Sequence, residues 1–334
     1  MSRSGNTQQS EDQDVLARLE ARRHPVTSRY IAPHEATLRR ALQWVAPDAL
    51  DATVGAWLAE QARAGRLDNQ TLAIAVDGKS LRGAVQAGGR PVHLFAAMVG
   101  KEGIVVAQRE VDHKTNEIPE FRPLPSSLDL EGMVVTADAL HTQRDHATFL
   151  VQDNTPTMCS RSTTTSPRRW LLWRSCSSRI LSSPSHTATQ TDRGHSRVEQ
   201  RSIEVIDTCP EQVGFPHASQ AWCIVREVFN LDGTARSCET VYGLTSMAQN
   251  KAGPDRLLDL VRGQWGIENS LHPVRDVTFD EDRCQVRTGS GPRVMATLGN
   301  LAIGVLRLAG ATNIAAGLRW AAHKPAPVLA LLGL

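Results

Sequence analysis

Several signals that would assign this chain to a familiar functional class are missing. No two of its six cysteines form a Cys-x-x-Cys pair, and none lies beside a spaced pair of histidines. This argues against a zinc site and favours reduced, intracellular thiols. The formal net charge is only +2, so a global basic field is absent, and any binding of nucleic acid must use local patches of charge.

Long hydrophobic runs are missing as well. The first fifteen residues lack the apolar segment of a secretory signal. The most apolar late run, 294–306, contains Asn300 and is shorter than the roughly 20 residues that cross a bilayer. We therefore expect a cytoplasmic protein with no membrane partner. With 41% apolar and 22% charged residues, the composition suits a soluble chain of about two domains.

One internal stretch lacks residue types that the rest of the chain uses freely. Residues 154–185 contain nine Ser, five Thr and five Arg, but no Ala, Gly, Val, Asp, Glu or Lys. Such a run fits a nucleic-acid-binding tract, a disordered linker, or chain that was never selected as protein. The residues of this stretch alone do not decide among these three interpretations.

The remaining residues have the periodicities of an α/β protein. Residues 1–15 are polar and expected to be disordered. Residues 16–70 predict a helical region that could contact DNA, with apolar helical stripes between 35 and 64. Residues 71–334 predict one α/β domain with a mixed sheet and C-terminal helices. Its predicted strands are 72–78, 91–100, 103–112, 133–140, 201–207, 220–229 and 238–247, and its predicted helices include 116–130, 141–152 and the chain from Pro254 onward.

Two aspartates follow buried strands. Asp77 lies in AIAVDGKS and Asp138 in VVTADALH, each after four or five apolar residues. Ligands of α/β sheets gather where strands emerge at the sheet edge. A single such Asp is most simply a turn or helix cap. Two on neighbouring strands favour a shared role, because converging carboxylates repel unless a cation lies between them, and hard divalent cations prefer oxygen ligands.

A third acid, Glu268, lies in RGQWGIENSLHPVR. A helix formed by these residues could bury an apolar stripe against the sheet and present Glu268 to the two aspartates. An exposed Glu on an amphipathic helix is the simpler interpretation of these residues alone. Helical spacing places Gln264, Glu268, Leu271 and Arg275 on one face, beside a stripe of Leu257, Val261 and Trp265.

Six motifs follow one another along the chain: AVDGKSLRGA, TADALHTQRDHA, TDRGHSRVEQR, VYGLTS, WGIENSLHPVRDVTFDED and RTGSGPRVMATLGNLAIGVLRLAGATNIA. In this order they resemble the Asp-Asp-Glu transposases of bacterial insertion sequences, and most of all the group of the H-repeat-associated proteins. The likeness runs from about Arg22 to Leu334, with a gap between about Gln152 and His186. It implies a ribonuclease-H-like fold with a triad of Asp77, Asp138 and Glu268, separated by 138 − 77 = 61 and 268 − 138 = 130 residues.

The resemblance also implies a reaction. Family members cleave double-stranded DNA at the terminal inverted repeats of their element and join the ends to target DNA. The three carboxylates would hold two Mg²⁺ ions, with Mn²⁺ as a substitute, and the protein would act as a homo-oligomer on DNA. Each basic residue alone is most simply a solvated surface charge. As a set, the candidates for DNA contact are Lys79, Arg82, His141, Arg144, Arg193, Arg197, Arg201 and Arg275.

Some positions depart from the family pattern. Pro273 lies inside the predicted catalytic helix and cannot donate to the carbonyl of Asn269, which predicts a kink after Glu268. Ser196 stands where the family has Gly, and Gln264 where it has a basic residue or His. Residues 153–185 interrupt the likeness where the next core strand belongs. A compensated frameshift explains this better than a selected linker or an RNA-binding tract.

The sequence therefore favours an insertion-sequence transposase, either active or a degenerate, inactive copy. The alternatives are a non-catalytic DNA-binding remnant that occupies the element ends, and another ribonuclease-H-like nuclease. We expect residues 153–185 to be irregular, poorly packed chain in place of a core strand. Translating the coding DNA in its other two frames across this interval tests the frameshift.

Overall fold

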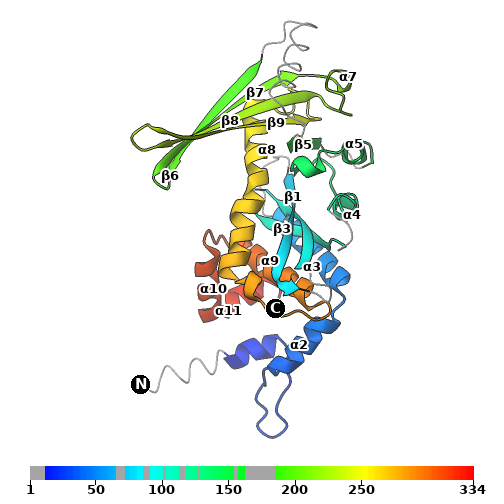
Figure 1. Ribbon diagram of the computed structural model, residues 1–334. Helices are drawn as coiled ribbons and strands as arrows, with labels where there is room; N and C mark the ends of the chain where they lie inside the picture. The colour runs from blue at the N-terminus through cyan, green and yellow to red at the C-terminus, as the bar shows by residue number, and fades with distance from the viewer. Residues whose placement is uncertain are drawn as a thin grey trace. The chain divides into compact units, whose positions relative to one another are not determined.

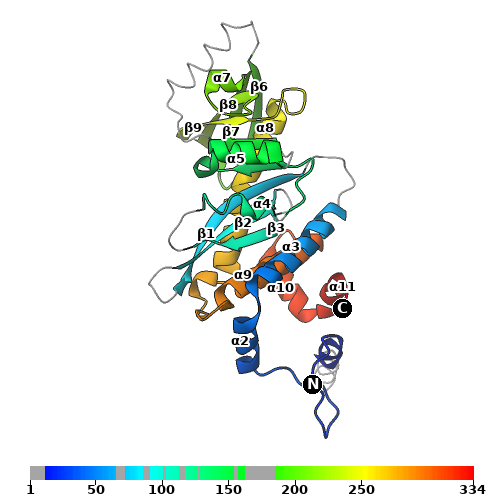
Figure 2. The ribbon, with the colours of Figure 1, turned by 90° about the vertical axis from the view of Figure 1, so that its right-hand side faces the viewer.

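The computed structural model describes residues 12–64, 72–85, 91–100, 103–112, 117–126, 128–153, 157–161 and 185–334. The chain forms two compact units, and the strands and helices of both are drawn in Figures 1 and 2. The first unit takes residues 1–66, 80–94 and 273–334, and the second takes residues 67–79 and 95–272.

A mixed sheet forms the framework. β4 is parallel to β1, and β5 is parallel to β4, whereas β5, β9, β8, β7 and β6 follow one another in antiparallel pairs. The predicted α/β class with a mixed sheet and flanking helices is confirmed. The order β3-β2-β1-β4-β5-β9-β8-β7-β6 arranges β1 (Ala73–Val85), β2 (Pro91–Val99), β3 (Ile104–Glu110), β4 (Val134–Ala137), β5 (Thr157–Arg161), β6 (His186–Gly194), β7 (Arg197–Asp207), β8 (Gln220–Asn230) and β9 (Ala235–Thr245).

The strand sequences explain which parts of the sheet are covered. All four residues of β4, VVTA, are buried, as expected for a central strand with both faces packed. β6 instead alternates between partly buried and exposed residues along HTATQ, which is typical of a strand with one solvated face. β6 was not among the predicted strands, because its sequence offers few apolar residues to mark that alternation.

Helix α8 (Pro254–Gly266) packs on the sheet of the second unit (Figure 1). It begins with Pro254 at its first position, where the missing N–H costs nothing. Its predicted apolar stripe is buried: Leu257, Val261 and their neighbours lie in one core cluster with residues of β7, β8 and β9. The side chains from the sheet are Ile203, Val205, Trp222, Ile224 and Val241.

The chain after α8 leaves regular α geometry earlier than predicted. Ile267–Leu271 (η3) and Val274–Thr278 (η4) are π-helical, and the N–H of His272 donates to the carbonyl of Ile267, five residues back. Pro273 keeps helical dihedral angles, with φ −64° and ψ −32°. The kink after Glu268 stays a prediction: one irregular turn already contains Glu268, and a second follows Pro273. A wider turn relieves the clash between a proline ring and the carbonyl four residues earlier.

Part of the Arg/Ser stretch forms a core strand. β5 pairs with β4 from Val134↔Thr157 to Ala137↔Ser160 and with β9 at Cys159↔Thr245. Cys159 is buried beside Val134 and Trp222. The expectation of irregular chain is wrong for residues 157–161, because they pair with a strand on each side and bury Cys159, which packs as a small apolar side chain. Residues 154–156 and 162–184 lie outside the described residues.

A two-residue turn joins β6 to β7. Gly194 pairs with Arg197, and both residues between them, His195 and Ser196, are left-handed, with φ of 50° and 57°. Such turns match the twist of a hairpin but favour Gly or Asn. Ser196, which replaces the glycine of the family pattern, therefore carries a cost of about 1–2 kcal/mol.

Helices dominate the first unit. α2 (Glu35–Trp44) and α3 (Pro47–Ala64) confirm the helical pattern predicted there, and residues 12–18 are helical too, so the expected disorder of residues 1–15 is wrong for 12–15. Residues 1–11 lie outside the described ranges. α3 packs closely on α9 (Gly291–Leu308), since a methyl group at Gly304 would lie 2.6 Å from Leu58.

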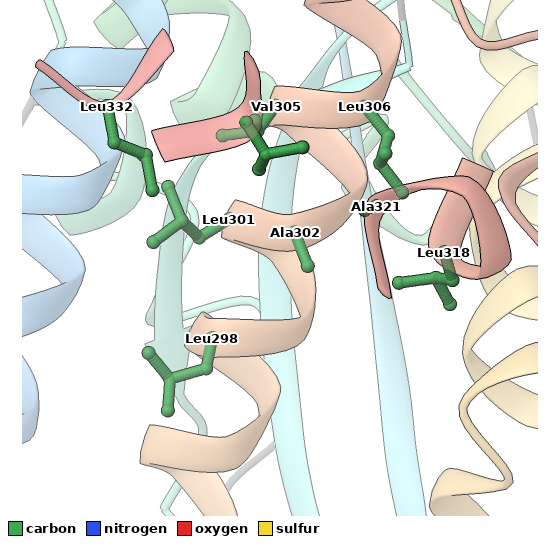
Figure 3. A pocket seen from close by; sticks show the side chains of 9 residues that line it. Leu298, Leu301, Ala302, Val305, Leu306, Leu318, Ala321 and Leu332 are labelled. Atoms are coloured by element: carbon green, nitrogen blue, oxygen red, sulfur yellow. The ribbon is translucent and has the colours of Figure 1, made fainter. Parts of the chain in front are cut away.

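Two further helices, α10 (Ile314–His323) and α11 (Pro325–Leu331), pack on α9 and enclose an apolar pocket (Figure 3). Only Leu, Ala and Val line it, so its wall carries no group that could hold a metal or activate water. None of the helices in the described ranges is long and apolar enough to cross a membrane.

Candidate active site

Parallel pairing of β1 and β4 brings Asp77 and Asp138 to neighbouring positions. The register ends at Val76↔Ala137, and the two aspartates are the next residues of their strands. β4 ends before Asp138, as predicted, whereas β1 continues to Val85. The prediction that β1 ends at its acid is wrong, because the strand runs past Asp77, with β2 as its neighbour in the sheet.

Asp138 also caps the turn that follows it. Its Oδ1 accepts hydrogen bonds from the backbone N–H groups of Leu140, at 2.9 Å, and His141, at 3.3 Å. These residues belong to a 3₁₀ turn, η1 (Ala139–His141). The capping role expected of a single aspartate is thus present, and it fixes the direction of the Asp138 carboxylate.

Asp77 lies in a strongly negative environment. Its side chain is 18% exposed. Burial raises the pKa of Asp77 to about 7, and the negative charges of Glu117, Glu268 and Asp138 add to that shift, against a hydrogen bond from the N–H of Gly78. Glu268 and Asp138 therefore both lie within electrostatic range of Asp77.

Two neighbours of Asp77 were missed from the sequence. Glu117 lies in the proline-containing segment after β3, where the hydrophobic pattern does not predict which way a side chain points. His272 lies with Nδ1 4.0 Å from Oδ2 of Asp77. It follows Glu268 by four residues, so its helical spacing could have identified it.

Gln264 connects α8 to both aspartate-bearing strands. Its Nε2 donates to the carbonyl of Val76 at 2.9 Å, and its Oε1 accepts from Oγ1 of Thr136 at 2.7 Å. Gln264 and Thr136 are 6% and 3% exposed. A basic side chain could not accept the Thr136 bond, so the departure from the family pattern is matched by Thr136. Because Val76 precedes Asp77 and Gln264 precedes Glu268 by one turn, this amide sets the helix against the strands.

The comparison with protein families decides what this arrangement belongs to. A family model described as a transposase DDE domain matches residues 68–304. The chain belongs to this family. The predicted resemblance is confirmed, and the family uses divalent metal ions.

Relatives of this DDE domain include two Escherichia coli proteins. The H repeat-associated protein YhhI of strain K12 is 25% identical over 251 residues, which cover 70% of this chain and 63% of YhhI. YncI of strain O157:H7 is 25% identical over 240 residues, which cover 70% and 61%. The chain thus spans less than two thirds of the length of these relatives. A piggyBac transposase synaptic complex with hairpin DNA aligns at 10% identity, 71% and 46% coverage and a TM-score of 0.37, which is too low to support a conclusion.

The side chains near Asp77 in this DDE domain are of a chemical type that suits a divalent cation. Asp77, Asp138, Glu268 and Glu117 offer the oxygen donors that hard cations prefer, and a cation would relieve the repulsion at Asp77. Within the described ranges, no three His, Cys, Asp or Glu side chains are gathered closely enough to hold a metal ion. Asp138, Glu268 and Glu117 are in electrostatic range of Asp77, and shared coordination of a cation would need their side chains to move.

The basic residues predicted to contact DNA differ in exposure. Arg82, Arg144 and Arg193 are exposed, and Lys79 and Arg197 are partly buried. His141, Arg201 and Arg275 are buried. Arg275 forms two hydrogen bonds with Glu281, at 2.9 and 2.8 Å, and His141 contacts Glu117. These buried groups are engaged inside the chain.

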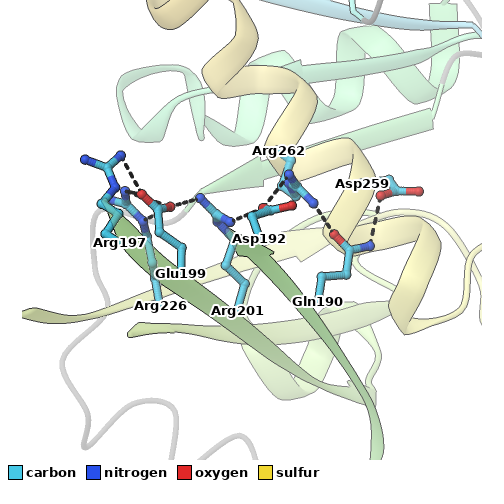
Figure 4. Close-up of polar contacts among 8 residues, drawn as sticks. All are labelled: Gln190, Asp192, Arg197, Glu199, Arg201, Arg226, Asp259 and Arg262. Carbon is cyan, nitrogen blue, oxygen red and sulfur yellow. Dashed lines mark hydrogen bonds and ion pairs between the residues drawn. The ribbon is translucent and has the colours of Figure 1, made fainter. Parts of the chain in front are cut away.

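Arg201 belongs to a charged network across β6, β7, β8 and α8 (Figure 4). It donates to Asp192 at 2.7 Å and to Glu199. Although burial acts in the opposite direction, a hydrogen bond from Arg226 and the charge of Arg201 hold the pKa of Glu199 below its usual value. Arg262 of α8 donates to Asp192 at 2.8 Å, so the network holds α8 against β6.

The first prediction concerns Gln264. Gln264→Leu and Thr136→Val should each lower the free energy of unfolding by about 1–3 kcal/mol, because each leaves a buried partner unsatisfied. The double variant should lose clearly less than the sum, since both partners are then gone. Urea unfolding of the four proteins measures this coupling. Effects that add within about 0.5 kcal/mol would show that the Gln264–Thr136 bond is not formed.

The second prediction follows from the raised pKa of Asp77. In the presence of a metal chelator, ionisation of Asp77 lowers the free energy of unfolding. This loss of stability is absent below pH 3.8, grows towards about pH 7 and is complete above it. Asp77→Asn should therefore exceed the wild type in unfolding free energy at pH 8 by on the order of 1–4 kcal/mol, and the difference should shrink towards pH 4.

A matched control is Asp232→Asn, because hydrogen bonds from Thr234 lower the pKa of this exposed acid. The Asp232→Asn variant should not gain stability relative to the wild type as the pH rises. Equal unfolding free energies of the wild type and Asp77→Asn at pH 8 would contradict the proposed cost of ionising the buried Asp77 beside other carboxylates.

Proposed function

We propose that this chain is a transposase that cleaves double-stranded DNA at the ends of an insertion sequence and joins those ends to target DNA. The observation that carries this proposal is the position of Asp138 and Glu268 close enough to Asp77 to act on its charge, in a chain of the DDE family. Two strands and the turn after α8 supply one carboxylate each, which is the arrangement that the catalytic triad requires.

The three carboxylates would hold the cations in this proposal. Two bound Mg²⁺ ions, or Mn²⁺ in their place, supply activation of the attacking hydroxyl and stabilisation of the leaving oxygen. Asp77 has the most to gain from a cation, because it is desolvated and faces several anions. Glu268 is exposed and therefore accessible to a phosphate group of DNA.

DNA binding would use the exposed part of the basic set. Arg82, Arg144 and Arg193 are the best candidates, with Lys79 and Arg197 as partly buried neighbours. Arg82 keeps 83% of its side chain exposed although it lies 3.9 Å from Asp282. Phosphate contacts by such residues make affinity fall steeply with salt. The homo-oligomer on DNA, the cytoplasmic location and the DNA contact by residues 16–70 remain part of this proposal.

A non-catalytic DNA-binding remnant is the second candidate. Two observations favour it: no three His, Cys, Asp or Glu side chains of the described residues lie close enough together to hold a metal ion, and Ser196 occupies a left-handed position. The presence of β5 argues the other way, because part of the interrupted region still completes the sheet.

The third prediction tests both candidates. With Mg²⁺, the protein should nick a duplex that carries the terminal repeats of its own element. Asp77→Ala should reduce this rate by at least about 100-fold, because loss of a metal ligand exceeds the usual effect of its outer-shell partners. Glu131→Ala, an exposed acid in the same unit, is the matched control and should nick normally.

Each outcome separates the alternatives. Unchanged nicking by Asp77→Ala rejects the assigned triad. Specific DNA binding by the wild type without nicking in Mg²⁺ or Mn²⁺ supports the remnant. Nicking without transfer of the cut end into a second DNA supports another nuclease.

A further inference from the structure

Glu117 is a fourth carboxylate at Asp77. It belongs to the described segment 117–126, between β3 and α4 (Pro123–Ser126), and its side chain is 15% exposed. Among the charged residues around Asp77, Glu117 has the largest influence, ahead of Glu268 and Asp138. Neither the strand pattern nor the triad spacing accounts for an acid at this position.

A buried histidine holds this carboxylate. Nε2 of His141 lies 3.0 Å from Oε2 of Glu117, and the imidazole side chain is completely buried. A carboxylate only accepts, so Nε2 carries the hydrogen and donates it. Nδ1 of His141 is buried and has no hydrogen-bond partner among the described residues. The hydrogen bond to Glu117 is therefore what offsets the cost of burying this ring.

Aromatic packing fixes the histidine and the segment that carries Glu117. The ring of Phe121 lies 5.0 Å from that of His141 and 4.1 Å from that of His146, and Phe95 lies 4.8 Å from His141 on another side. The two nitrogens of His146 lie 3.2 Å from the carbonyl oxygens of His141 and Ile118. Side chains held in this way on several sides keep a defined rotamer.

The same turn connects Glu117 with the second aspartate. Asp138 accepts a hydrogen bond from the N–H of His141, and the side chain of His141 donates to Glu117. Hydrogen bonds thus run from Asp138 through His141 to Glu117, which in turn acts on Asp77. The orientation of Glu117 depends on the turn that orients Asp138.

A purely structural hydrogen bond between Glu117 and His141 does not explain this position. Such a pair would be more stable away from other acids, because an anion beside the desolvated Asp77 adds repulsion. Proteins retain this kind of cost at functional sites, where a bound ligand removes it. A divalent cation is the ligand that several carboxylates share.

We propose that Glu117 is a fourth carboxylate ligand of the divalent cation at Asp77, and that His141 is the positioning residue that orients it. This inference rests on the proposed function, because it takes the cation of that site as given. It deepens that function by assigning an anionic ligand outside the Asp77, Asp138 and Glu268 triad.

The fourth prediction measures Mn²⁺ binding to the full chain without DNA, by calorimetry or by the electron paramagnetic resonance signal of free Mn²⁺. Glu117→Gln keeps the shape and the acceptor for His141 but removes the charge, and should weaken Mn²⁺ binding at least about 10-fold. Glu120→Gln is the matched control from the same segment; Glu120 pairs with Arg109 at 2.8 Å. Its Mn²⁺ affinity should stay within about twofold of the wild type.

His141 variants test the positioning role. His141→Phe keeps an aromatic ring between Phe95 and Phe121 but removes the donor, and should weaken Mn²⁺ binding by several-fold. His141→Gln restores an N–H donor and should recover part of that affinity. Equal Mn²⁺ affinity of the wild type, His141→Phe and His141→Gln would overturn the role of His141.

Unfolding in chelator at pH 8 separates a site ligand from a structural ion pair. Glu117→Gln should unfold at the same or a higher temperature than the wild type, because it relieves repulsion at Asp77, and it should gain less stability from added Mn²⁺. A lower unfolding temperature in chelator together with wild-type Mn²⁺ affinity would overturn the proposal.

Asp77→Asn distinguishes the two levels of inference. If Asp77→Asn loses Mn²⁺ affinity and Glu117→Gln retains it within twofold, Glu117 is not a ligand and the proposed function stands. If Asp77→Asn binds Mn²⁺ as the wild type does, the proposed site itself is wrong, and the assignment of Glu117 is wrong with it.

Discussion

The burial of Asp77, close to further carboxylates, is the constraint that the surrounding structure has to withstand. Asp77 is desolvated and faces Glu117, Glu268 and Asp138. Without rigid support, such anions would move apart and separate the turn after α8 from β1 and β4. Two kinds of contact hold these elements together. The neutral, buried amide of Gln264 forms hydrogen bonds with both strands, and Arg262 of α8 forms an ion pair with Asp192 of β6.

The parts of the site that follow from local sequence were predictable, and those that depend on distant contacts were not. Asp138 follows an apolar strand of four buried residues, and the stripe of Leu257 and Val261 predicts which face of α8 is buried. Glu117 has no such local signal, because its position comes from a bond to His141, 24 residues away. Likewise, only the fold shows that Gln264 meets Thr136 from β4, which makes a glutamine suitable where the family pattern has a basic residue.

Burial changed the interpretation of the basic residues. His141, Arg201 and Arg275 lie near family motifs, and their sequence gives no reason to separate them from Arg82 or Arg193. In the fold they bind Glu117, Glu199 and Glu281. A charge that is paired inside the chain orients its neighbours instead of binding phosphate. The Arg/Ser stretch gives a similar lesson, since composition predicted irregular chain and Cys159 nevertheless lies in a core strand.

The central claim is that carboxylates from β1, β4 and the turn after α8 meet at one divalent cation. Anomalous X-ray scattering from crystals of the protein grown with Mn²⁺ tests it most directly. The account predicts Mn²⁺ density at about 2.0–2.2 Å from carboxylate oxygens of Asp77 and Asp138, with Glu268 in the same coordination group. Mn²⁺ density only elsewhere, or a structure in which Glu268 points away from both aspartates with the ion bound, would contradict it.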